Sequence, residues 1–138
     1  MKTVDYERLG LPVELINHLL IQIKNWPGEV LKSHNDSSHL IHKLSFLADL
    51  EFDINTPEIA EAVRKITEHI SAENLYQVKV NIPQHFGGTG EEQWSWMLCD
   101  APHLLYLLKK LGYSENDKMK AGVEFLLNVQ NANGWPCR

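Results

Sequence analysis

Two short stretches of the sequence hold most of the side chains that could do chemistry. The first contains His34, Asp36, His39 and His42. His39 and His42 are three residues apart, a spacing that places two imidazoles on one face of a helix, where they could bind a metal ion or a polar ligand. No third metal ligand is fixed by the spacing. A structural interpretation, in which these residues cap a helix and cover its polar surface, stays open.

The second stretch contains Cys99, Asp100 and His103. Cys99 and His103 lie one helical turn apart with the carboxylate beside them, and thiolate, carboxylate and imidazole are ligand types that zinc selects. These three residues form the candidate zinc site, and zinc is the candidate cofactor. Asp100, His103 and His42 are the candidate catalytic residues. The alternative interpretation is a small buried cysteine, a capping aspartate and a hydrogen-bonded histidine.

Trp94 and Trp96 precede this cluster. Their aromatic faces could line an apolar pocket, and π faces stabilise carbocations. With His39 and His42 they are the candidate ligand-binding residues. Aromatic residues near the start of a helix are also common core residues, and the sequence leaves both interpretations open.

Apolar residues recurring at three- and four-residue steps predict the helices that position these side chains. A helix is predicted from Val13 to Ile23, and a second through Leu50, capped by Asp36, Ser37 or Ser38. The other predicted helices are a third from Pro57 to Ile70, a fourth beginning between Glu91 and Asp100 and ending at Leu111, and a fifth beginning at Asn116 or Asp117. Between the third and fourth helices, residues 74–90 predict a long loop with at most a short extended piece near Gln77 to Ile82.

The second and fourth predicted helices carry the same pattern. Residues 42–52 and 103–113 both read His-x-Leu-x2-Leu-x2-Leu-x-aromatic, at a shift of 61 residues. Internal repetition of this kind indicates an array of helical hairpins, each unable to bury its apolar faces alone. The shift makes His42 and His103 equivalent, and on adjacent helices they would converge on a common cavity, although duplication of a structural histidine predicts the same equivalence.

Composition limits the remaining possibilities. The chain has 138 residues, of which 43% are hydrophobic, and this predicts a single domain spanning residues 1–138. A net charge of −5 argues against nucleic acid as a partner. There is no apolar run of the length that a signal peptide or a membrane span requires, so a cytoplasmic protein without a transmembrane segment is expected.

The C-terminal residues resemble a known repeat. The following residues match that repeat in order and nearly in spacing: Lys120, Ala121, Gly122, Phe125, Leu126, Leu127, Gln130, Gly134 and Trp135. The repeat is that of the terpenoid cyclase and protein prenyltransferase superfamily, and the resemblance is to its squalene-cyclase-like members. It implies an all-α fold of antiparallel helical hairpins arranged as an α/α toroid. It also implies that Phe125, Gln130, Gly134 and Trp135 are structural repeat residues.

Two functions are compatible with this resemblance. A closed toroid needs more helix pairs than this chain supplies, so we expect a partial ring, incomplete at the C-terminus, whose open apolar edge is covered by a missing half or by self-association. The first hypothesis is a cavity for an apolar or isoprenoid-like small molecule, with or without catalysis. The second is a non-catalytic helical scaffold that binds a protein partner. The Asp-x-Asp-Asp acid motif of the cyclases is absent.

Overall fold

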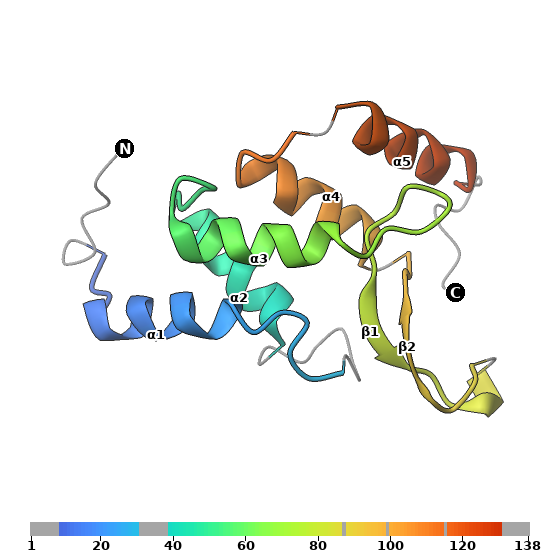
Figure 1. Ribbon diagram of the computed structural model, residues 1–138, viewed down its shortest axis with the longest axis horizontal. Coiled ribbons are helices and arrows are strands. Elements are labelled where there is room, and N and C mark those ends of the chain that lie inside the picture. Colours follow the sequence, from blue (N-terminus) through green and yellow to red (C-terminus); the bar gives the residue numbers. More distant parts are fainter. Residues whose placement is uncertain (1–8, 31–38, 87, 99, 115, 131–138) are drawn as a thin grey trace.

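The regular structure of the chain is mostly helical, as the spacing of its apolar residues predicts. The computed structural model describes residues 9–30, 39–86, 88–98, 100–114 and 116–130. Within these ranges it has five α-helices and two short strands (Figure 1). The helices are α1 (Val13–Ile23), α2 (Leu40–Asp49), α3 (Pro57–Thr67), α4 (Ala101–Lys110) and α5 (Asn116–Asn128).

Local sequence explains how these helices begin. Pro57 lies in the first turn of α3 and Pro102 in the first turn of α4, where the missing N–H group costs no helical hydrogen bond. The N-cap of α2 is His39, whose Nδ1 accepts a hydrogen bond from the Ile41 backbone N–H at 3.1 Å. The prediction that Asp36, Ser37 or Ser38 caps this helix was therefore wrong. A neutral imidazole nitrogen satisfies the same free N–H group.

The helices α2 and α4 end in the same way. Glu51 and Gly112, which follow them, both have positive φ angles, 68° and 91°. One residue further on, the Phe52 N–H donates to the Leu47 carbonyl at 3.2 Å, and the Tyr113 N–H donates to the Leu108 carbonyl at 3.0 Å. These left-handed terminators lie at positions that the 61-residue shift makes equivalent. The two predicted units therefore share backbone geometry as well as sequence pattern.

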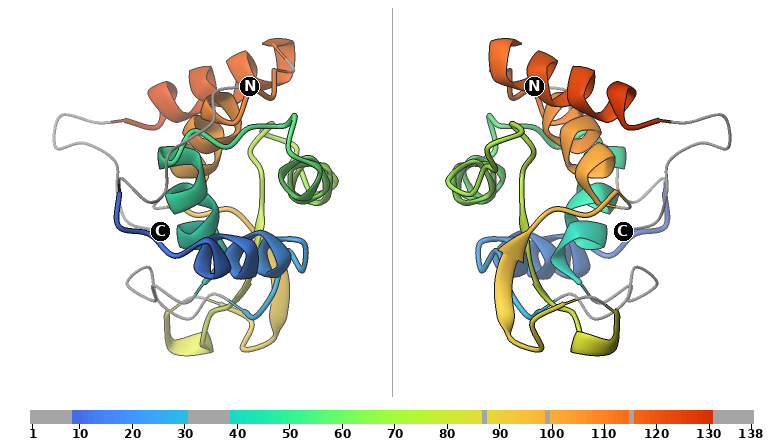
Figure 2. Two further views of the ribbon diagram at one scale, coloured as in Figure 1. Left: turned by 90° about the vertical axis from the view of Figure 1, so that its left-hand side faces the viewer. Right: turned by 90° about the vertical axis from the view of Figure 1, so that its right-hand side faces the viewer.

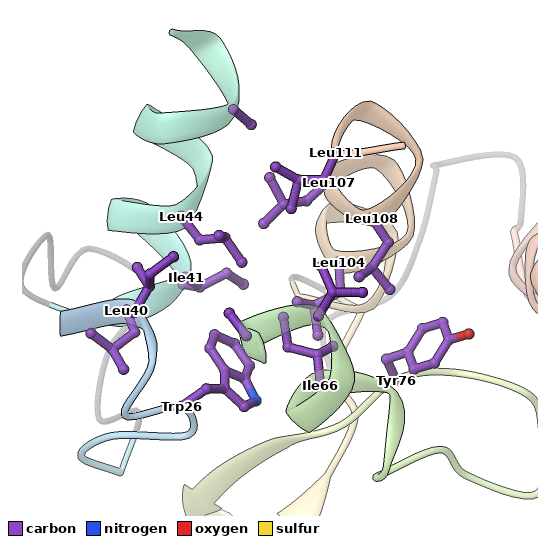
Figure 3. Packing of buried hydrophobic residues seen from close by; sticks show 14 of the residues in the cluster. Trp26, Leu40, Ile41, Leu44, Ile66, Tyr76, Leu104, Leu107, Leu108 and Leu111 are labelled. Atoms are coloured by element: carbon purple, nitrogen blue, oxygen red, sulfur yellow. The ribbon is translucent and has the colours of Figure 1, made fainter. Parts of the chain in front are cut away.

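The helices pack both on the next helix along the chain and on the helix two places away. α1 packs on both α2 and α3, α2 packs on α4, and α4 packs on α5. Figure 2 shows α5 at one end of the helical part and α1 at the other, with α2 and α4 between them. In Figure 3, Ile41 and Leu44 of α2 point toward the same space as Leu104 and Leu107 of α4. The apolar stripes predicted for α1, α2, α3 and α4 supply most of this core. Its fully buried members include Ile23, Ile41, Leu44, Leu47, Ile59, Ile66, Leu104, Leu107, Leu108 and Leu111.

The prediction of an all-α fold was wrong in one region. Strand β1 (Val78–Asn81) pairs antiparallel with strand β2 (Glu92–Ser95), with Val78 opposite Ser95 and Asn81 opposite Glu92. A short 3₁₀ helix (Gln84–Phe86) lies between the strands. Val78 and Val80 turn alternate side chains into the core, and this burial favours the extended backbone. The predicted long loop is thus a hairpin, whose first strand falls within the short extended piece expected there.

The hairpin also moves the start of the fourth helix. α4 begins at Ala101, one residue after the predicted interval, because β2 occupies residues 92–95. Among the described residues, no helix is both long enough and apolar enough to cross a membrane.

Candidate functional site

His42 and His103 lie close together across the contact between α2 and α4. Their ring centroids are 6.3 Å apart and their ring planes are inclined by 45°. His103 Nε2 lies 3.3 Å from Ser45 Oγ, one turn along α2 from His42. The convergence predicted from their equivalent positions is confirmed. The structure thus brings the candidate catalytic residues His42 and His103 together.

The surroundings of His103 favour its neutral form. Burial lowers the pKa of His103 below its ordinary value of 6.5, because a charged imidazole loses hydration there. The nearby His42 lowers this pKa further through charge repulsion, whereas Asp100 and Asp49 oppose the shift. A neutral imidazole can act as a proton acceptor or a ligand, so His103 keeps the protonation state that either role requires.

The zinc site predicted from Cys99, Asp100 and His103 is described only in part. Asp100 is buried at the N-cap of α4, three residues before His103 on the same helix. Cys99 lies outside the described residues. Among the residues that are described, no three His, Cys, Asp or Glu side chains are grouped so as to hold a metal ion.

His39 and His42, the other predicted pair, differ in their surroundings. His39 is only 6% exposed, caps α2 and meets the ring of Trp26 edge-on at a centroid distance of 6.0 Å. His42, by contrast, faces α4. The structure therefore gives His39 a capping contact at the start of α2. His34 and Asp36 of the same stretch lie outside the described residues.

Trp94 and Trp96 are both in contact with the turn that follows α3. Trp94, on β2, stacks on His69 with the ring centroids 3.4 Å apart and the planes 5° from parallel. The Trp96 Nε1–H donates to Glu73 Oε2 at 3.2 Å, and its ring meets Phe125 of α5 edge-on at 5.5 Å. These contacts connect the hairpin and the residue after it to the turn that follows α3 and to α5.

The residues of the C-terminal repeat motif are described as far as residue 130. Gly122 is buried where α5 crosses the chain at Asn74, and a Cβ atom on Gly122 would lie 2.4 Å from the Asn74 carbonyl oxygen. Phe125 packs on Trp96, while Gln130 is exposed. Gly134 and Trp135 lie outside the described residues. Of the four predicted structural repeat residues, Phe125 therefore has a described packing contact, and the structural role of the motif stays a prediction.

One apolar hollow among the described residues was not predicted from the sequence. It is an open groove of about 560 Å³ between α4 and α5. Three large apolar side chains that line it are strongly exposed: Tyr106 (61%), Val123 (45%) and Leu127 (56%). The remaining lining residues are Pro102, Leu105, Lys109, Tyr113, Ser114, Met119, Lys120 and Leu126. None of the predicted site residues that the structure describes lines this groove.

The sequence did contain one signal for this groove. Met119, Val123, Leu126 and Leu127 form an apolar stripe on α5, and a stripe of this kind predicts burial. In the structure Leu126 is buried, whereas Val123 and Leu127 remain open to solvent. An apolar stripe that its own chain leaves partly exposed is a common mark of a binding surface.

Comparison of the chain with protein-family models, with curated proteins and with solved structures finds no match.

Proposed function

We propose that this chain is a helical-hairpin protein of the α/α-toroid type that binds a small apolar, isoprenoid-like molecule. The observation that carries the proposal is the groove between α4 and α5. Its volume of about 560 Å³ falls within the roughly 300–1,000 Å³ that is common for small-molecule sites. Its lining is mostly aliphatic and aromatic, and covering Tyr106, Val123 and Leu127 with an apolar ligand would remove their exposed surface from water.

Two features of the packing support the toroid part of the proposal. In a toroid the helices alternate between an inner and an outer layer, so each helix packs on the helix two places along the chain. α1 packs on α3 in this way, and α2 packs on α4. Equivalent terminators at Glu51 and Gly112 end the two helices of the inner layer in this arrangement.

The proposed function is binding of the ligand in the groove and does not include catalysis there. His42, His103 and Asp100 do not line the groove, so a ligand bound there would not touch the candidate catalytic residues. Catalysis would require a second site at the α2–α4 contact.

The test is a titration of the protein with geraniol, a neutral ten-carbon isoprenoid alcohol, followed by NMR chemical shifts. Saturable shifts confined to α4 and α5 are expected. Leu127→Gln should weaken binding about tenfold, because it replaces apolar contact area with an amide. Ile21→Gln is the matched control, since Ile21 is 62% exposed on α1, remote from the groove. The proposal fails if geraniol gives no saturable shifts, or if both variants bind it as the parent does.

A second candidate function is a scaffold that binds a protein through this same face. It is favoured by the exposure of Tyr106, Val123 and Leu127, which an interface would bury. If the partner is a second copy, sedimentation should show a concentration-dependent dimer that Leu127→Gln disrupts. A monomer that saturates with geraniol would support the small-molecule function instead.

A further inference from the structure

The charged residues in the described lining of the groove are of one sign. Lys109 of α4 and Lys120 of α5 both line it, and no Asp or Glu is among the lining residues that the structure describes; Glu115, which follows Ser114, lies outside the described residues. This is the reverse of the whole chain, in which 18 acidic residues outnumber 13 basic ones. Asp117 and Glu124 lie on α5, but neither side chain lines the groove. The groove therefore presents positive charge beside an apolar surface.

The two lysines lie toward the same end of the groove. α4 and α5 form a hairpin in which Lys109 is in the last turn of α4 and Lys120 is in the first half of α5 (Figure 1). At the other end lie Pro102 from the start of α4 and Leu127 from the end of α5. The seven-residue step from Pro102 to Lys109 corresponds to about 10 Å of helix. The groove thus has a cationic end and an apolar end, separated by the length of a medium alkyl chain.

From this arrangement we infer that the ligand is a single-chain amphiphile with an anionic carboxylate head, whose head lies between Lys109 and Lys120 and whose tail extends toward Pro102 and Leu127. The inference rests on the proposed function, because it assigns the class of ligand for the same groove. An ammonium group attracts a carboxylate as a point charge, and the attraction is strengthened beside an apolar wall that excludes water.

Lys110 provides an internal comparison. It follows Lys109 directly on α4 and is not among the lining residues. Its Nζ pairs with Asp49 Oδ1, which raises the pKa of Lys110, and lies 5.8 Å from the centroid of the Tyr106 ring. Lys110→Gln and Lys109→Gln therefore remove the same charge from neighbouring positions on one helix. Only Lys109→Gln removes it from the groove.

The experiment compares geranate with geraniol, two ligands that share one carbon skeleton and differ in the head group. Affinities are measured by calorimetry on the full chain, at ligand concentrations below aggregation. Geranate is expected to bind about tenfold more tightly than geraniol, the order of a charge-assisted contact that remains open to solvent. The difference in affinity between geranate and geraniol should decrease as the salt concentration is raised, because exposed charges are screened.

The variants then locate the head group. Lys109→Gln and Lys120→Gln should each lower the affinity for geranate much more than the affinity for geraniol, whereas Lys110→Gln should leave the difference between the two affinities as in the parent. If geraniol binds in the groove and geranate binds no more tightly, the inference is overturned while the proposed function stands. If neither ligand binds, both the inference and the proposed function fail. A loss of geranate affinity in Lys110→Gln as large as that in Lys109→Gln would show a nonspecific effect of net charge and overturn the inference.

Discussion

His42 on α2 and His103 on α4 face one another at a centroid distance of 6.3 Å, at positions that the sequence repeat makes equivalent. A second equivalent pair lies along the same two helices, where the Lys110 ammonium pairs with the Asp49 carboxylate. Equivalent residues of adjacent units therefore meet near both ends of the α2–α4 contact. The residue types differ in their effect, because two imidazoles repel when both are charged and the lysine–aspartate pair attracts.

The first prediction concerns the pKa of His103. NMR titration should give a His103 pKa below its ordinary value of 6.5, because the ring is half-buried and lies near His42. His42→Asn should raise this pKa toward the ordinary value, since it removes the repulsion but leaves most of the burial. A His103 pKa that is unchanged in His42→Asn would show that burial alone causes the shift.

The second prediction is a dependence of stability on pH. Because the pKa of His103 is lowered on folding, the unfolded chain binds more protons near pH 6 than the folded protein does. The stabilisation that His103 gives as a neutral group is fully present above about pH 6.5 and is lost as the pH falls through the folded-state pKa. Urea unfolding of the parent and of His103→Gln should therefore give stabilities that converge on acidification. If the stabilities of the two proteins changed with pH in parallel, the lowered pKa of His103 would be contradicted.

Sequence patterns predicted the helices well because each helix buries one stripe of its own residues. Ile16, Leu19, Leu20 and Ile23 of α1 recur at helical spacing, and all four are buried. The repeat alignment also predicted that His42 and His103 would be neighbours, since equivalent helices of successive hairpins pack together. These features depend on local periodicity, which a single sequence records.

Strand β2 could not be predicted in the same way. Glu92–Ser95 is four residues long, has no β-branched residue, and is extended because it pairs with Val78–Asn81. Pairing between segments distant in sequence leaves little trace in either segment alone. The groove escaped prediction for a similar reason. Its walls come from two helices, and only the packing of α5 on α4 decides that Val123 and Leu127 face solvent.

The third prediction uses the equivalence of Glu51 and Gly112. Both have positive φ, a conformation that costs a residue with a side chain about 1 kcal/mol. Glu51→Gly should therefore stabilise the protein by up to about 1 kcal/mol, and Gly112→Ala should destabilise it by a similar amount. A Cβ on Gly112 would meet Ile54 at an ordinary 3.6 Å, so backbone strain and not crowding sets the cost. Chemical denaturation measures the free energy of unfolding of both variants. A change of the same sign in both would contradict the shared left-handed terminator.

The fourth prediction is that Gly122→Ala lowers the free energy of unfolding. Helix propensity alone would favour alanine by about 1 kcal/mol. The new Cβ, however, would lie 2.4 Å from the Asn74 carbonyl oxygen, so the backbone of one segment must move. Overpacking of this kind costs about 1–3 kcal/mol, and a net destabilisation is expected. Glu124→Ala, at an exposed position on the same helix, serves as the control and should change the free energy of unfolding by less than about 0.5 kcal/mol.

The fifth prediction separates the core from the groove by comparing two leucines on neighbouring helices. Leu108 of α4 is fully buried, and Leu108→Ala should destabilise the protein by about 2–5 kcal/mol through the cavity that it leaves. Leu127 of α5 is 56% exposed in the groove, so Leu127→Ala should change the free energy of unfolding by less than about 0.5 kcal/mol. Leu127→Ala should nevertheless weaken geraniol binding severalfold, because it removes apolar surface that the ligand would cover. Urea unfolding and calorimetry on the same two variants measure these effects. A stability loss in Leu127→Ala as large as that in Leu108→Ala would mean that Leu127 is a core residue and the groove is closed in solution.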